Sequence, residues 1–143
     1  MLFNISNKNL KTEKQINDLV GKPFSLIENL KRARIDSPKL FITRCSAAIY
    51  DLLHVNESVK FCNIEIRPKG IVIGFQSRLE VYVLVIPFYK LVIFKPGNTI
   101  TFHIDHHYIS IDSSKNSKGV TKFIAKIEKE KETNTPYSPL YMY

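Results

Sequence analysis

The spacing of apolar residues predicts that the first third of the chain is helical. A T-x-x-Q capping box begins at Thr12, and Ile16, Leu19 and Val20 follow it on one helical face. Gly21 and Pro23 end this helix, because glycine favours helix C-termini and proline cannot continue a helix. A second capping box at 25–28 predicts another helix, whose C-terminal end carries the basic run at 31–34.

A third helix is predicted in the stretch "DSPKLFITRCSAAIYDLLHV". It would begin with Ser37 as the N-cap and Pro38 at the first helical position. The apolar positions then follow a broad helical stripe, which indicates a face in the core: Phe41, Ile42, Cys45, Ala48, Ile49, Leu52 and Leu53.

After residue 60 the pattern changes from helical to alternating, which predicts β-strands. The stretch 61–77 reads as a hairpin with Pro68 and Lys69 at the centre of its turn. Ile66 then lies opposite Ile71, and Ile64 opposite Ile73, with all four on one face. Glu65, Arg67 and Val72 belong to the other face.

The stretch 103–112 repeats the shape of this hairpin, with an offset of 38 residues from 65–74. The same register places the turn at His106-His107, Ile104 opposite Ile109, and Phe102 opposite Ile111. Between the hairpins, one strand leads to Pro87 and another covers "KLVIF", and "KPGN" at 95–98 indicates a turn.

An amphipathic helix is predicted after the last strand. Its apolar side is made by Val120, Phe123, Ile124 and Ile127, and its other side by lysine and glutamate. We therefore predict an α+β fold in which N-terminal helices precede an antiparallel β-meander, a bent sheet or barrel, capped by this C-terminal helix. The expected divisions are a helical segment at 1–57, the meander and helix at 58–132, and an extended tail at 133–143.

The net charge of +8 favours an acidic partner such as an anionic membrane surface or nucleic acid. The charge is evenly spread, since residues 1–60 carry ten Lys and Arg against six Asp and Glu, and residues 61–143 carry eleven against seven. Two cysteines without a ligand spacing indicate buried thiols in a reducing compartment, and we expect a cytoplasmic location. The longest apolar run, Val81 to Tyr89, is far shorter than the ~20 residues of a membrane span.

Histidines cluster in "FHIDHHY", and this motif raises the possibility of a metal site. His103 and Asp105 would share a strand face, with His107 at the tip, so one alternative is a metal-binding protein or hydrolase centred on these three residues. The competing interpretation is an exposed polar hairpin end. No nucleophile motif or phosphate-binding loop accompanies the cluster, and we expect no cofactor and no catalysis.

A second alternative is a weak nucleic-acid binder. Sheets that bind single strands expose aromatic residues among lysines and arginines, whereas Tyr82, Phe88 and Tyr89 lie in apolar surroundings that favour core packing. The lysines of the C-terminal helix form a partial stripe that Glu128, Glu130 and Glu132 dilute. The apolar run 79–94 also fits a sheet face that needs a second copy, which leaves a homo-oligomer open.

The order of elements in residues 60–131 resembles the bacterial pleckstrin-homology-like (PH-like) and GRAM-type domains. "IPFYKL" (86–91), "HIDHHYISID" (103–112) and "KFIAKIEK" (122–129) are similar to their central segment, later hairpin and capping helix. The resemblance implies a binding module for a protein or an anionic surface, in which some members bind phosphoinositides near the first hairpin. The candidate anion- or partner-binding residues are Arg67, Lys69, Arg78 and Lys90, although the spaced basic pattern of lipid-binding members is missing.

Overall fold

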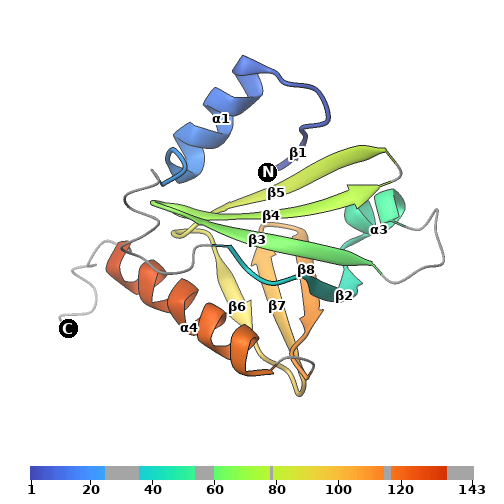
Figure 1. The fold of residues 1–143 in the computed structure, drawn as a ribbon, viewed down its shortest axis with the longest axis vertical. Coiled ribbons are helices and arrows are strands. Elements are labelled where there is room, and N and C mark those ends of the chain that lie inside the picture. Colours follow the sequence, from blue (N-terminus) through green and yellow to red (C-terminus); the bar gives the residue numbers. More distant parts are fainter. Residues whose placement is uncertain (25–35, 54–59, 78, 115–116, 135–143) are drawn as a thin grey trace.

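The computed structural model describes residues 1–24, 36–53, 60–77, 79–114 and 117–134, which form three helices and eight strands (Figure 1). In chain order these are β1 (Leu2–Asn4), α1 (Leu10–Val20), β2 (Leu40–Cys45), α3 (Ala47–Leu53), β3 (Phe61–Arg67), β4 (Gly70–Ser77), β5 (Glu80–Pro87), β6 (Val92–Phe94), β7 (Thr99–Ile104), β8 (His107–Asp112) and α4 (Ser117–Asn134). The predicted α+β class is confirmed. The second predicted helix, its basic run and the tail from 135 onward lie outside the described residues.

All eight strands belong to one antiparallel sheet with the order β1-β5-β4-β3-β2-β8-β7-β6. The sheet is open, because β1 and β6 are its two ends rather than neighbours. It consists of two short meanders, β3-β4-β5 and β6-β7-β8, joined through β2. The N-terminal stretch therefore contributes two strands to the sheet, β1 and β2, which were not predicted.

The prediction of a helix beginning at Ser37 was wrong for its first half, because Leu40–Cys45 form β2. Leu40, Ile42 and Cys45 all face or border the main core, at spacings of two and then three residues. A β-bulge between Ile42 and Arg44 explains the odd spacing, since it adds one residue to the strand. The bulge breaks the alternation of a strand, and the resulting pattern imitates a helix that continues into α3.

The first hairpin has the predicted register. Ile66 pairs with Ile71 and Ile64 with Ile73, and all four side chains are buried. Pro68 and Lys69 form the two-residue turn. Val72 lies on the opposite face as predicted, where it is buried under α1 rather than exposed.

The second hairpin has a different register from the predicted one. Its two turn residues are Asp105 and His106, so Ile104 pairs with His107 and Phe102 with Ile109. Asp105 has a φ of 53°, a left-handed conformation that aspartate tolerates well, and this favours a turn one residue earlier. Each pairing moves by two residues, so the face of every side chain is preserved and the isoleucines remain buried.

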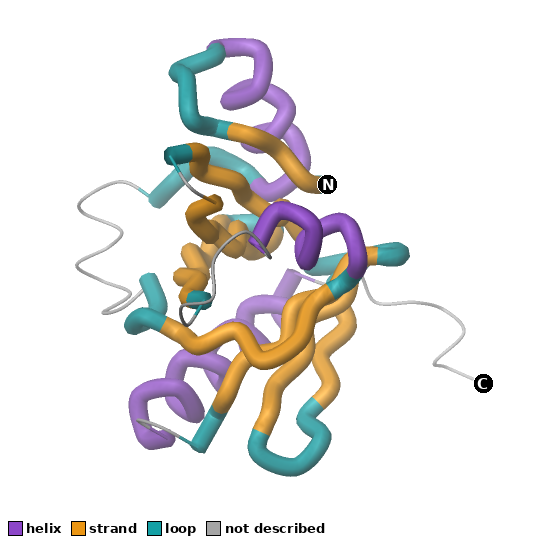
Figure 2. The backbone as a smooth tube through the Cα atoms, turned by 90° about the vertical axis from the view of Figure 1, so that its right-hand side faces the viewer, coloured by secondary structure: helices purple, strands orange, loops and turns teal. Residues whose placement is uncertain are grey.

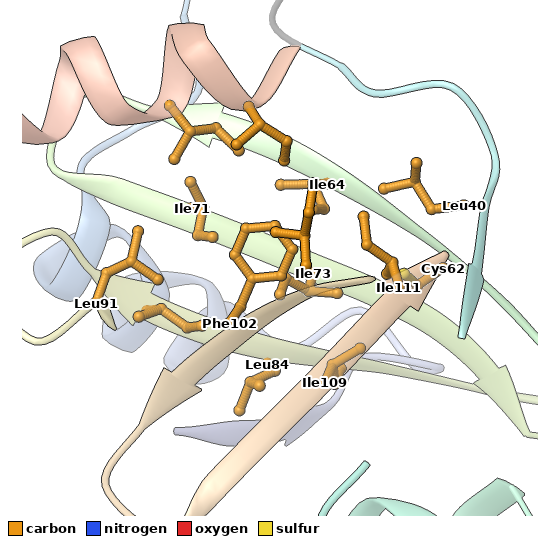
Figure 3. Packing of buried hydrophobic residues seen from close by; sticks show 14 of the residues in the cluster. Leu40, Cys62, Ile64, Ile71, Ile73, Leu84, Leu91, Phe102, Ile109 and Ile111 are labelled. Carbon is orange, nitrogen blue, oxygen red and sulfur yellow. The ribbon is translucent and has the colours of Figure 1, made fainter. Parts of the chain in front are cut away.

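The main core lies between the two meanders, where their inner faces meet (Figure 3). α4 covers this core from one side with its predicted residues Val120, Phe123, Ile124 and Ile127, each at most 3% exposed. α3 adds Ile49 and Leu53 to the same core. None of the helices in the described part of the chain is long and apolar enough to cross a membrane.

A second, smaller core lies on the outer face of β4 and β5, under α1. Ile16 and Val20 of α1 pack there against Val72, Val83 and Val85. In the turned view of Figure 2, α1 and α4 lie on opposite sides of the strands between them. β4 and β5 are buried on both faces, and this explains why their sequences are almost continuously apolar. Strands in the middle of a layered fold have the same pattern.

α1 begins earlier than its sequence pattern indicates. Asn9, not Thr12, is the N-cap, and its Oδ1 accepts hydrogen bonds from the backbone N–H groups of Lys11 (2.9 Å) and Thr12 (3.3 Å). The predicted end of the helix is confirmed. Gly21 has a φ of 86° and its N–H donates to the Asn17 carbonyl.

A side chain added at Gly70 would disturb the contact between α1 and the sheet. A Cβ at this position would press on the Ile86 carbonyl and lie 2.5 Å from Val20 Cγ1. We expect Gly70→Ala to lower the free energy of unfolding by about 3 kcal/mol, the upper range for overpacking, as measured by urea denaturation. Gly74→Ala is the matched control, since its Cβ would meet the movable amide of Asn63 and touch Val83 only at an ordinary van der Waals distance of 3.9 Å. An equal loss in both variants would contradict the prediction.

Candidate functional site

The three residues of the candidate metal site do not converge. His103 lies opposite Tyr108 on the outer face of the β7–β8 hairpin, where their rings stack with centroids 5.2 Å apart. His107 pairs with the buried Ile104 and belongs to the inner face. Within the described ranges, no group of three or more His, Cys, Asp or Glu side chains is arranged to hold a metal ion. The metal site therefore stays a prediction that this geometry does not support.

His107 is nevertheless in unusual surroundings. Its ring lies 4.1 Å from that of His106, centroid to centroid, and its Nδ1 is buried with no hydrogen-bond partner among the described residues. Burial lowers the pKa of His107 from its ordinary 6.5, and the positive charges of His106 and of the Met1 amino group lower it further, while Asp105 opposes the shift. The folded chain thus favours the neutral imidazole.

Arg67, the first candidate anion-binding residue, is engaged within the fold. Its Nη1 donates to the Gly21 carbonyl (2.9 Å) and to Asn17 Oδ1 (3.1 Å), both at the C-terminal end of α1. Its Nε lies 3.1 Å from Glu65 Oε1, and only 12% of the side chain is exposed. The guanidinium satisfies a helix-end carbonyl and complements the helix dipole, so its charge ties α1 to β3.

The other candidate cations differ in their surroundings. Lys69 and Lys90 are exposed, and the Phe88 N–H donates to the Lys69 carbonyl, so the two turns that carry these lysines lie side by side. Lys90 Nζ lies 3.6 Å from Asp105 Oδ2 in an exposed ion pair, which contributes little stability. Arg78 lies outside the described residues.

Neither cysteine has the surroundings of a catalytic nucleophile. Burial raises the pKa of Cys62 to about 12, and it also raises the pKa of Cys45. Cys62 is a buried thiol in β3, as predicted. Cys45 is half-buried at the end of β2, not on the helix that its spacing indicated.

Open cavities at the surface of the described residues include one beside α1 and one along α4. One, of about 470 Å³, lies beside the N-terminal half of α1 and is lined by residues of both charges, including Lys8, Glu13 and Arg67. The other, of about 480 Å³, follows the first turns of α4 and is lined by Lys118, Gly119, Lys122, Phe123 and Lys126. The second cavity has only positive charges along its rim.

The exposed side of α4 carries more organised charge than its sequence suggested. Lys118, Lys122 and Lys129 are exposed, while Glu128 turns toward the β6–β7 connection, where its carboxylate lies 2.7 Å from Lys95 Nζ. Successive helix residues are rotated by roughly 100°, so 118, 122, 126 and 129 fall within roughly 80° of one another. We call Lys118, Lys122, Lys126 and Lys129 the lysine face of α4.

Aromatic residues line the outer face of the second meander. Phe94 of β6, His103 of β7 and Tyr108 of β8 form a row with ring centroids 5.1 and 5.2 Å apart, which we call the aromatic row. The predicted packing of Tyr82 and Phe88 in or against the core is confirmed, whereas Tyr89 is 69% exposed. The alternation of inward and outward side chains in 101–108 indicated that His103 and Tyr108 face outward. Only the pairing with β6 shows that Phe94 lies beside them.

Removing the Arg67 guanidinium distinguishes its structural role from ligand binding. We expect Arg67→Ala to lower the free energy of unfolding by about 2 kcal/mol, because charged hydrogen bonds to Gly21 and Asn17 are lost. Lys69→Ala, an exposed lysine two residues away, is the control and should change it by less than about 0.5 kcal/mol. Arg67→Lys should recover only part of the loss, since an ammonium lacks the fork geometry. If Arg67→Ala leaves the free energy of unfolding unchanged, the fold does not depend on this charge.

The His107 environment predicts a pH dependence of stability. Because the folded-state pKa lies below 6.5, the unfolded chain binds the proton more readily, so the free energy of unfolding falls as pH drops below about 6.5. We expect His107→Gln to reduce the difference between chemical denaturation curves recorded at about pH 7.5 and about pH 5.5. His103→Gln is the control from the same hairpin. The interpretation fails if His107→Gln leaves the pH difference as large as in the unchanged protein.

Comparisons of this chain with protein-family models, with curated proteins and with solved structures gave no match. The resemblance of residues 60–131 to PH-like domains is not tested by this outcome and stays a prediction.

Proposed function

We propose that this protein is a non-catalytic binding module that docks onto an anionic membrane surface through the lysine face of α4. The observation that carries the proposal is the exposure of Lys118, Lys122 and Lys129 on one side of a helix whose opposite side is anchored in the core. A rigid helix that holds several cations in one plane suits a flat anionic surface.

Packing makes α4 a rigid support for these charges. Phe123 and Ile127 are at most 3% exposed, so the helix cannot rotate without exposing apolar surface to water. The lysine side chains have long apolar stems and point away from the core, which lets their ammonium groups reach lipid phosphates. Each lysine near an anionic leaflet contributes about 1 kcal/mol to binding.

The neighbouring carboxylate does not cancel this charge. Glu128 is bound to Lys95, which lies just after β6, so its negative charge is neutralised at the side of the helix. The groove along Lys118, Lys122 and Lys126 offers a recess next to the exposed ammonium groups. Together these features support a docking face on which lysines predominate, with Glu130 and Glu132 at its borders.

The same proposal extends to the rest of the protein. A PH-like domain in residues 60–131, a cytoplasmic location and a protein partner are compatible with a module of this kind. The first-hairpin cation Arg67 would not take part, because its guanidinium is engaged with α1.

Vesicle sedimentation tests the proposal with a matched pair of triple variants. We expect the chain to sediment with vesicles of phosphatidylserine in phosphatidylcholine, and Lys118→Gln/Lys122→Gln/Lys129→Gln to bind roughly a hundredfold more weakly, from about 1 kcal/mol per lysine. The control, Lys8→Gln/Lys11→Gln/Lys14→Gln, removes the same charge from exposed lysines in and before α1.

The control should retain most of the binding. Equal losses in both triple variants would mean that net charge alone drives binding, and the proposed face would then be wrong. Absence of binding to the anionic vesicles at low salt would also overturn the proposal, as would equal binding to pure phosphatidylcholine.

A further inference from the structure

The outer face of the second meander differs from that of the first in what covers it. On the first meander, α1 buries Val72, Val83 and Val85 to 7% exposure or less. On the second, Val92 and Phe94 are 46% and 52% exposed, and they stand beside His103 and Tyr108. An apolar and aromatic surface in this position indicates a docking site.

The aromatic row crosses three neighbouring strands on this face. His103 lies between Phe94, whose ring it meets edge-on, and Tyr108, with which it stacks. Beside the row, Thr101 and Ser110 are buried and hydrogen-bonded to each other at 2.6 Å, so their hydroxyl groups are already satisfied. Flat rings can therefore approach the row without leaving a buried hydroxyl unpaired.

The strand edge next to this face is protected against strand addition. β6 has only three residues, and Lys90, Lys95 and Pro96 flank it. Short edge strands flanked by lysine and proline resist pairing with another strand. This argues against a second copy or an extended peptide that pairs with β6, and it leaves the face itself as the surface for a partner.

Basic residues lie on the strand next to the aromatic row and in the turn before β6. Arg44 of β2 is exposed and pairs with Ser110, in the same cross-strand line as Thr101 and Phe94. Lys90, just before β6, forms an exposed ion pair with Asp105 at 3.6 Å, which a stronger anion can replace. The whole chain carries a net charge of +8, which attracts polyanions.

We propose that this face binds single-stranded nucleic acid, with bases stacked on Phe94 and Tyr108, between which His103 is packed, and backbone phosphates near Arg44 and Lys90. Aromatic rings flanked by cations are the arrangement that sequence-tolerant single-strand binders use, because every base has a π-face. A lipid surface would use the cations but has no flat rings to stack. This site is separate from the lysine face of α4 and does not depend on it.

Fluorescence anisotropy tests the proposal with labelled oligo-dT and oligo-rU of about 12 nucleotides, a length typical of such surfaces. We expect both single strands to bind more tightly than a duplex of equal length. Phe94→Ala and Tyr108→Ala should each weaken binding roughly tenfold, because each removes a stacking ring. Tyr108→Phe should bind normally, since it keeps the ring.

Two controls remove exposed side chains from other surfaces. Leu79→Ala, in the β4–β5 turn, and Leu10→Ala, at the start of α1, should bind oligonucleotides as the unchanged protein does. Thermal melting of each variant confirms that it is folded, and Phe94 is exposed enough that its loss leaves the core intact. A difference between oligo-dT and oligo-rU would identify whether DNA or RNA is the better ligand.

The proposal is overturned if no single strand binds at low salt. It is also overturned if the duplex binds as tightly as the single strands, or if Phe94→Ala and Tyr108→Ala leave binding unchanged, because electrostatics alone would then explain the result. Loss of vesicle binding in Phe94→Ala would assign this face to lipid instead. The triple lysine variant of α4 distinguishes the two proposals, since it should weaken vesicle binding while the aromatic row still binds oligonucleotides.

Discussion

The fold depends on one strand that pairs with two different groups of neighbours. Leu40 and Phe41 of β2 pair with β3, and Ile42 to Cys45 pair with β8. The bulge between Ile42 and Arg44 bends the strand at this change of partner. A single sheet can therefore turn its inner face onto itself, and the isoleucines of both meanders share one core. Without this strand, the inner apolar faces of the two meanders would not be brought together.

The bend also gives the two outer faces different surroundings. α1 lies on β4 and β5 and forms a second core there, held in place by the contacts of Arg67 with the end of the helix. α4 and α3 contribute to the inner core instead. The outer face of the second meander is left with the exposed Phe94 ring beside the half-buried rings of His103 and Tyr108, and the charged side of α4 is left facing solvent. Both proposed binding surfaces follow from this unequal covering of one sheet.

Several residues that suggest chemistry in the sequence have structural roles. Arg67 caps a helix, Cys62 packs in the core, and His107 lies at the rim of the sheet with a buried ring nitrogen. The binding surfaces use more ordinary residues, namely lysines spaced along a helix and rings aligned across strands. Surface position and alignment, more than residue type, distinguish these two groups.

The sequence alone determined the elements whose partners are close along the chain. The register of the Pro68-Lys69 hairpin and the buried stripe of α4 depend on local turn chemistry and on regular periodicity, so both were predicted correctly. The tertiary structure decided the rest. β2 became a strand because β3 and β8 pair with it on both sides, β1 exists through its pairing with β5, and the aromatic row needs three strands in register. Such pairings join residues far apart in the chain, and a local pattern carries no information about which distant strand supplies the hydrogen bonds.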